Sequence, residues 1–193
     1  MADWLDTTLP KNCPRNEGLA AARLAGANHV GKGGFALSSP AFGPNGELDP
    51  CFTADEEDAV APPMEWTAPP PGTQEMVLLV EDASMSPPTL HWAVWGLAGQ
   101  KGMLLEGETA PRTGKNHAGN SEWLLPSLAT EDGAHCYVFQ LFALDLPLTL
   151  MPGATKDALL AEMEGHVTAV AVTSATYASS DEDFDGDWND EDD

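Results

Sequence analysis

The stretch DGAHCYVFQLFALD, residues 132–145, decides the fold. Alternation predicts a strand with two faces: His135, Tyr137, Phe139, Leu141 and Ala143 on one, and Cys136, Val138, Phe142 and Leu144 on the other. Because both faces are largely apolar, we expect this strand in the middle of a core. A histidine and a tyrosine nevertheless open it on the same face. The stretch LHWAVWGLAG, residues 90–99, also begins with a histidine, His91, followed by an apolar strand pattern.

The rest of the chain predicts short strands and few helices. Strands are expected at EMVLLVED (75–82), HVTAVAVTSATY (166–177) and in GFALSSPAF (34–42), and helices at EGLAAARLAG (17–26) and TKDALLAEMEG (155–165). A long connection rich in glycine, proline and charge separates residues 99 and 132. With 18 glycines and 16 prolines in 193 residues, the chain favours one mainly β, sandwich-like domain over a helical bundle.

The charge excludes two classes of partner. The net charge is −23, from 31 acidic and 8 basic residues. Such a chain repels nucleic acid and anionic lipid surfaces, so no nucleic acid is expected, and a protein partner with a basic surface fits better. The last thirteen residues hold nine acids, and Asp181, Asp183, Asp185, Gly186 and Asp192 have the spacing of a calcium-binding EF-hand loop. A solvated, disordered acidic tail is the favoured interpretation.

Three cysteines, Cys13, Cys51 and Cys136, form an odd set without a CxxC pair. This argues against a disulfide framework and a zinc site, and predicts that Cys136 is an ordinary buried thiol. The N-terminus lacks the basic start and apolar run of a secretion signal, and no apolar run is long enough to cross a bilayer. The expected location is therefore the cytoplasm.

Polar groups stand where the predicted strands meet loops. Asp82 ends one strand, His91 begins another, and His135 and Tyr137 begin a third. If these strand ends converge, the phenol and the protonated imidazoles would donate to a small anion, while Asp82 orients an imidazole or receives an ammonium group. The same groups also suit a metal site of two histidines and a carboxylate, or acid–base chemistry. Taken singly, each histidine is more often a structural residue at a strand end than a ligand-binding one.

Several motifs in order resemble the phosphatidylethanolamine-binding protein (PEBP) family, in its bacterial Raf-kinase-inhibitor-like branch. They are SPAF, FTADEEDAVAPPMEWTAPPPGTQEMVLLVEDAS, LHWAVWGL, GAHCYVFQLFALDLPLTLMPGATKDALLAEMEGHV and a closing TY. The resemblance covers residues 35–178 and leaves an N-terminal extension, 1–34, and the acidic tail, 179–193, outside. It implies a β-sandwich with a large mixed sheet, a smaller antiparallel sheet and peripheral helices.

The resemblance also implies a pocket for a small anion such as phosphate, acetate or a phosphoethanolamine head group, without a cofactor. Its ligand-binding residues would be Asp82, His91, Gly133, His135 and Tyr137, and Pro126 aligns with the approach to that segment. Family members resemble regulators of kinases and proteases, which suggests an inhibitory role here.

The sequence departs from the family pattern after Asp82. DASMS replaces Asp-Pro-Asp-x-Pro, so Ser84 stands where a second aspartate is usual, and Ala83 and Ser86 replace prolines. These losses leave a second interpretation open, an interaction scaffold with a vestigial pocket. A third is a hydrolase that combines Asp82 and His91 with Ser84 or Ser86, although no GxSxG motif supports it.

Overall fold

The structure is a computed structural model that describes residues 3–179. In chain order its helices and strands are α1 (Leu5–Thr8), α2 (Ala20–Leu24), β1 (Leu37–Ser38), β2 (Gly46–Glu47), β3 (Met64–Trp66), β4 (Glu75–Asp82), β5 (Thr89–Ala98), β6 (Gly102–Leu104), β7 (Arg112–Thr113), β8 (His135–Leu144), α3 (Lys156–Met163) and β9 (Val167–Tyr177). Short 3-10 turns lie at Lys32–Gly34, Pro50–Phe52 and Thr130–Asp132.

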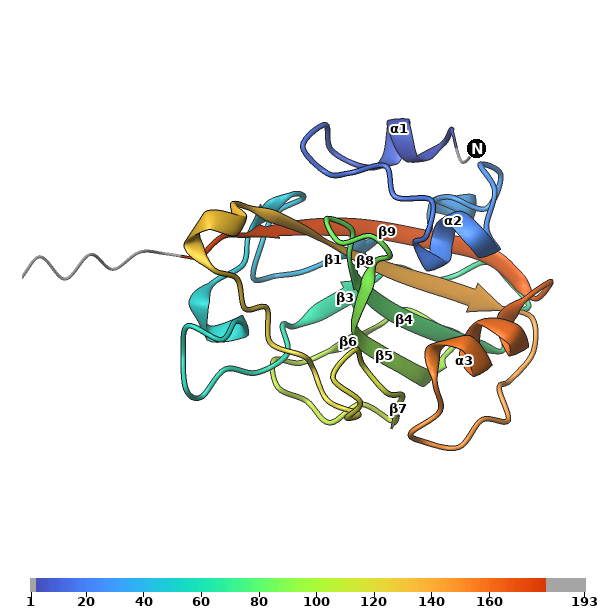
Figure 1. Cartoon of the computed structure of the whole chain (residues 1–193). Coiled ribbons are helices and arrows are strands. Elements are labelled where there is room, and N and C mark those ends of the chain that lie inside the picture. The colour runs from blue at the N-terminus through green and yellow to red at the C-terminus, as the bar shows by residue number, and fades with distance from the viewer. Residues whose placement is uncertain (1–2, 180–193) are drawn as a thin grey trace, which may run out of the picture.

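Two sheets make up the fold (Figure 1). The large sheet has the strand order β2-β9-β8-β4-β5-β7, and it is mixed because β2 runs parallel to β9 while the other neighbours are antiparallel. The small sheet, β1-β3-β6, is antiparallel. These observations confirm the expected mainly β sandwich of a large mixed sheet and a smaller antiparallel one, with peripheral helices.

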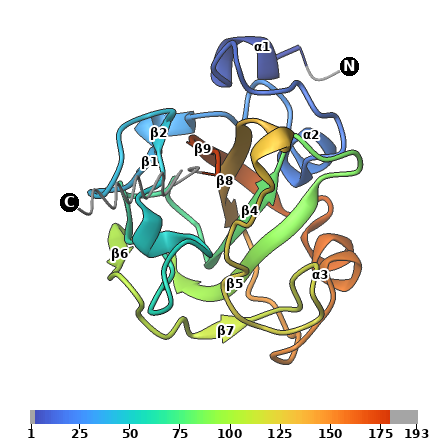
Figure 2. The ribbon, with the colours of Figure 1, turned by 60° about the vertical axis from the view of Figure 1, so that its left-hand side comes forward.

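The large sheet separates two hydrophobic cores. One core lies between it and the small sheet and contains Tyr137, Phe139, Leu141 and Ala143 of β8, whereas Cys136, Val138, Phe142 and Leu144 belong to the other. The alternation predicted for residues 135–144 is thus confirmed. Figure 2 shows α2 and α3 on one side of the large sheet and β1 and β6 on the other. Strand β8 is central because β9 pairs along its whole length on one side and β4 pairs with Tyr137 to Leu144 on the other.

The N-terminal segment covers the helical side of the sheet. Leu5, Leu9 and Leu19 are buried in that core. The large sheet binds the start of α2 through Glu81 of β4. Glu81 Oε2 accepts from the backbone N–H of Ala20 at 2.8 Å, and Glu81 also pairs with Lys156. A buried carboxylate at the positive end of a helix, with a cationic partner, is well satisfied. The described part of the expected N-terminal extension is therefore packed into the fold.

The expectation that Cys136 is an ordinary buried thiol was wrong. Cys13 and Cys136 form a disulfide between residues 123 positions apart, and Cys51 is the free cysteine among the described residues. An odd number of cysteines leaves one unpaired but excludes no single bridge. Short-range spacing also carries no information about a pair that only the fold brings together.

The helix expected at residues 155–165 is confirmed as α3. Thr155 Oγ1 accepts from the N–H of Ala158, and Gly165 follows the helix at φ +79°, a conformation that suits glycine. The connection between residues 99 and 132 is more structured than expected, since it contains β6 and β7. No helix within residues 3–179 is long and apolar enough to span a bilayer. The acidic tail and its calcium-loop pattern lie outside the described residues.

Candidate functional site

A pocket of about 440 Å³ opens where β4 ends and where β5 and β8 begin. Antiparallel pairing produces this convergence, because it sets Asp82 opposite Thr89 of β5 and opposite Tyr137 of β8. The pocket is lined by Asp82, Met85, Thr89, His91, His117, Leu124, Leu125, Ser127, Leu128, Asp132, His135 and Tyr137. Four of the predicted residues, Asp82, His91, His135 and Tyr137, therefore lie together around one cavity.

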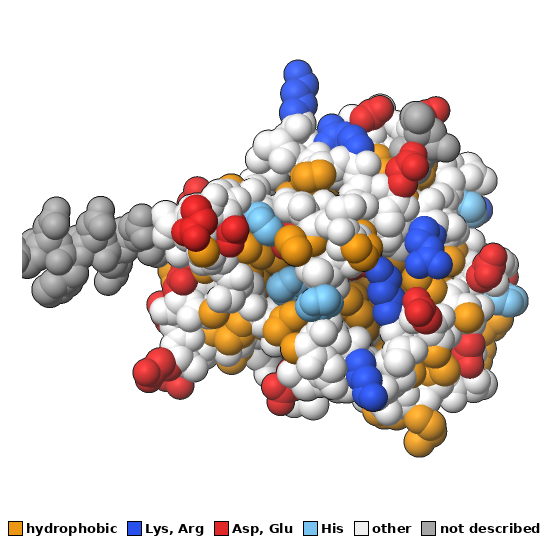
Figure 3. Space-filling view, in the orientation of Figure 1, with side chains coloured by type: hydrophobic (Ala, Val, Ile, Leu, Met, Phe, Trp, Pro, Cys, Tyr) orange, Lys and Arg blue, Asp and Glu red, His pale blue; other side chains and the backbone are white. Residues whose placement is uncertain are grey.

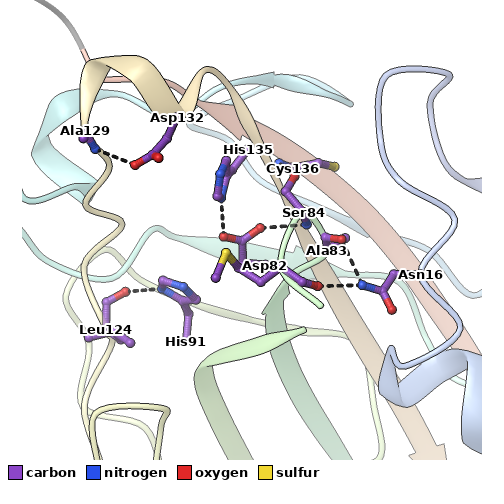
Figure 4. A network of polar contacts seen from close by, with 11 residues as sticks. Asn16, Asp82, Ala83, Ser84, His91, Leu124, Ala129, Asp132, His135 and Cys136 are labelled. Atoms are coloured by element: carbon purple, nitrogen blue, oxygen red, sulfur yellow. Dashed lines mark hydrogen bonds and ion pairs between the residues drawn. The ribbon is translucent and has the colours of Figure 1, made fainter. Parts of the chain in front are cut away.

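Asp82 orients His135. The Oδ2 atom of Asp82 lies 2.6 Å from Nδ1 of His135, and Oδ1 accepts from the N–H of Ser84 at 2.9 Å (Figure 4). Asp82 is 3% exposed, so both carboxylate oxygens find their partners within the protein. Donation from Nδ1 to the carboxylate leaves Nε2 of His135 as the ring nitrogen without a protein partner among residues 3–179.

His91 is held from the other side of the pocket. Its Nδ1 lies 2.7 Å from the carbonyl oxygen of Leu124, and its ring meets that of Tyr137 edge-on at 5.1 Å between centroids. Burial lowers the pKa of His91, while the Leu124 carbonyl and the Asp82 charge act in the opposite direction. A neutral His91 that donates through Nδ1 again leaves Nε2 open.

Tyr137 presents a buried phenol to the same cavity. The residue is 1% exposed, and its hydroxyl makes no hydrogen bond to any residue that the structure describes. Burial raises the pKa of Tyr137, and the nearby Asp82 charge raises it further, so the phenol stays protonated at neutral pH. The Tyr137 hydroxyl does not belong to the fully buried polar atoms without a partner, Trp4 Nε1 and Asn45 Oδ1, so it is open to the pocket and can donate to a ligand there.

Sequence reasoning missed four polar residues of the pocket, namely Thr89, His117, Ser127 and Asp132. His117 comes from the connection after β7, and Asp132 ends the 3-10 turn before β8. Figure 3 shows histidine side chains gathered on one face, where lysine and arginine side chains also appear despite the acidic composition. Asp132 begins the quoted stretch of residues 132–145 but was not predicted as a site residue, because only the tertiary structure brings these side chains to the pocket.

Two predicted residues do not line the cavity. Gly133 is exposed and adopts φ +69°, which lets the chain turn from the 3-10 segment into β8. Pro126 is buried, and its carbonyl accepts from the N–H of Ala54 at 2.9 Å. Both shape the approach to the pocket rather than its surface.

The Ser84 side chain binds the backbone of β8. Its Oγ accepts from the N–H of Cys136 at 3.0 Å, on the β8 backbone beside His135. The carboxylate–imidazole pair of the pocket is Asp82 with His135, not Asp82 with His91 as the hydrolase interpretation expected. Within residues 3–179, no group of three or more histidine, cysteine, aspartate or glutamate side chains is placed to hold a metal ion.

Comparison with known proteins identifies the family of this chain. Residues 38–178 match the family described as "Phosphatidylethanolamine-binding protein". A UPF0098 protein of Methanothermobacter thermautotrophicus is 30% identical over 151 residues, which is 73% of this chain and 97% of that protein. "Putative lipoprotein LppC" of Mycobacterium tuberculosis is 32% identical over 123 residues, covering 62% of this chain and 60% of that protein.

A solved structure shares the fold. CT736 of Chlamydia trachomatis, described as a PEBP homologue, superposes with a TM-score of 0.70 at 29% identity, covering 76% of this chain and 98% of CT736. The fold, the order of the motifs and the match over residues 38–178 lead to one conclusion: this chain belongs to the phosphatidylethanolamine-binding protein family.

Proposed function

We propose that the pocket between Asp82, His91, His135 and Tyr137 binds a small anion such as phosphate, or a phosphorylated head group. One observation carries the proposal. Three side chains that line this cavity each have a polar atom without a partner among residues 3–179: the Tyr137 hydroxyl and the Nε2 atoms of His91 and His135. An oxyanion offers the acceptors that a phenol and protonated imidazoles require.

Each side chain has a distinct task in this proposal. Tyr137 donates its O–H at any physiological pH, because burial keeps the phenol protonated. His135 donates through Nε2 while Asp82 fixes its ring and balances its positive charge. His91 takes up a proton when the anion arrives and then donates as well. For a phosphoethanolamine head group, the carboxylate of Asp132 on the pocket wall offers a partner for the ammonium group.

Calorimetric titration of the full chain with phosphate, and separately with phosphoethanolamine, tests the proposal. His135→Ala should abolish saturable binding. His166→Ala is the matched control, because His166 also pairs with an aspartate, Asp145, but on the surface. Saturable heat in the wild type and in His166→Ala, together with its absence in His135→Ala, supports the pocket. The absence of saturable heat in the wild type at millimolar ligand contradicts the proposal and favours the scaffold with a vestigial pocket.

Regulation of a kinase or protease, through a partner with a basic surface, extends the proposal. Charge complementarity with a chain of net charge −23 supports such a partner. The cytoplasmic location also stays a prediction. The Cys13–Cys136 disulfide speaks against it, because structural disulfides are typical of oxidising compartments. Fractionation of the producing cells is the direct test.

A further inference from the structure

The wall of the pocket includes a loop with little internal support. Residues 83–88 connect β4 to β5 directly after Asp82, and Met85 of this loop lines the cavity while being 43% exposed. The N–H of Ser84 holds one oxygen of Asp82, so the position of this loop also fixes the carboxylate that orients His135. The loop therefore needs a support from outside itself.

Asn16 supplies part of that support. Its Nδ2 donates to the carbonyl oxygens of Ala83 at 3.0 Å and Met85 at 2.7 Å, while its Oδ1 accepts from the N–H of Gly18 at 3.0 Å. Figure 4 shows Asn16 beside Ala83, on the opposite side of Asp82 from His91. One side chain thus binds two loop carbonyls from outside the pocket, across 67 and 69 positions of sequence.

The disulfide anchors the segment that contains Asn16, residues 13–18, next to the site. Cys13 is joined to Cys136, the residue between His135 and Tyr137. Cys136 in turn holds the loop with its backbone: its carbonyl accepts from the N–H of Ala83 at 2.9 Å, and its N–H donates to Ser84 Oγ at 3.0 Å. The segment and the loop are therefore fastened to one position of β8.

Gly18 shows how closely the segment meets the loop. A Cβ atom at this position would lie 2.7 Å from Cδ of Pro88, which is closer than real Cβ contacts come. The proline ring cannot swing away as a long flexible side chain would. Contact at Gly18, hydrogen bonds at Asn16 and the bond at Cys13 thus connect one side of the segment to residues 83–88 and 136.

We propose that residues 13–18 are a positioning element of the anion pocket: Asn16, Gly18 and the Cys13–Cys136 disulfide hold the 83–88 loop in its ligand-binding form. The inference rests on the proposed function, since it concerns the affinity of that same pocket. It assigns a role in the site to a segment that lies before residue 38, where the family match begins.

The first test compares two identical substitutions. Asn16→Ala removes both bonds to the loop, whereas Asn12→Ala, directly before the segment, removes the bond that Asn12 Oδ1 accepts from Asn45. We expect phosphate to bind about tenfold more weakly to Asn16→Ala, since two hydrogen bonds that order the loop are lost. Asn12→Ala should bind like the wild type. Equal phosphate affinity in all three proteins overturns the inference.

Gly18→Ala tests the same inference without removing a hydrogen bond. The added methyl group must displace Pro88 and with it the end of the loop, so phosphate affinity should again fall while the sheet stays folded. Thermal unfolding of each variant separates positioning from general damage. A variant that binds phosphate normally despite a shifted Pro88 contradicts the proposal.

The third arm opens the disulfide in a Cys51→Ala background, which removes the free thiol. Dithiothreitol, a neutral dithiol, becomes a cyclic disulfide while Cys13 and Cys136 each gain one hydrogen, and the intact mass reports the change. Phosphate affinity should fall in the reduced, still folded protein, as judged by circular dichroism. Unchanged affinity after complete reduction overturns the role of the bridge. If the oxidised wild type itself binds no phosphate, the proposed function has failed and not this inference alone.

Discussion

The Nδ1 atom of His135 lies 2.6 Å from the Oδ2 atom of Asp82, across two strands that pair in register. Asp82 ends β4 and His135 begins β8, 53 positions later. The pair fixes the tautomer and the direction of one imidazole, which leaves its second nitrogen facing a cavity. Asp82 therefore acts by orienting His135.

Asp82→Asn tests this orienting role. An asparagine has one carbonyl oxygen, so it cannot accept from both His135 and the N–H of Ser84. We expect about 1–3 kcal/mol less stability towards urea and about tenfold weaker phosphate binding. Asp145→Asn, in the exposed pair with His166, is the control and should change the stability by less than about 0.5 kcal/mol. Tighter phosphate binding by Asp82→Asn would show that the charge of Asp82 merely repels anions.

Tyr137→Phe and Tyr177→Phe form a matched pair with opposite expectations. The Tyr137 hydroxyl makes no hydrogen bond to the described residues, so its removal should leave the unfolding free energy nearly unchanged and weaken phosphate binding about tenfold. The Tyr177 hydroxyl bonds to Asp55 at 3.0 Å, so its removal should cost about 1 kcal/mol of stability and leave phosphate binding intact. Urea unfolding and calorimetry measure both quantities. A pair of variants with the reverse pattern contradicts the assignment of Tyr137.

Acid should strengthen the binding of sulfate, an anion that does not itself titrate near neutral pH. Burial holds the pKa of His91 below its ordinary value, so the free pocket contains a neutral ring at pH 7. An anion beside the ring favours the protonated form, so binding takes up a proton and the affinity rises as the pH falls. Calorimetry at several pH values between 5 and 8 measures the slope.

His91→Gln is the control for that slope, because glutamine cannot take up a proton. The slope should become smaller, and any remainder belongs to the other titratable groups of the pocket, His117, His135, Asp82 and Asp132. The depressed pKa also affects the free protein: the unfolded chain binds the His91 proton first, so stability is lost as the pH falls below about 6.5. A sulfate affinity independent of pH would remove His91 from the account.

Reduction of the disulfide should lower stability substantially. The bridge closes a loop between residues 123 positions apart, and bridges of this kind contribute about 2–5 kcal/mol. Urea unfolding of the Cys51→Ala protein with and without dithiothreitol measures the difference. If the two unfolding curves coincide, the N-terminal segment is held by its packing and hydrogen bonds alone.

Much of the fold could be predicted because local patterns carry it. The alternation from His135 to Leu144 predicted both faces of β8, and Thr155 and Gly165 marked the ends of α3. The short strands β2 and β7 could not be predicted, since two residues contain no period. Their pairing depends on a neighbouring strand that is remote in sequence.

The residues of the site also include some that the sequence predicts and some that it does not. Asp82, His91, His135 and Tyr137 stand at strand ends, so the sequence alone could bring them to one edge. His117 and Asp132 lie in connections whose path depends on packing, and the Cys13–Cys136 bridge depends on where the N-terminal segment crosses the sheet. These features follow from tertiary structure, which a single sequence does not display.

The most direct measurement is an NMR titration of the His91 and His135 imidazoles with phosphate, at pH 6 and pH 8. The two rings lie around one cavity, so one ligand should shift both with a single dissociation constant. We expect saturable shifts of both rings, larger at pH 6, with the surface histidine His166 unaffected. Signals of His91 and His135 that stay unchanged up to millimolar phosphate would contradict an anion pocket at this site.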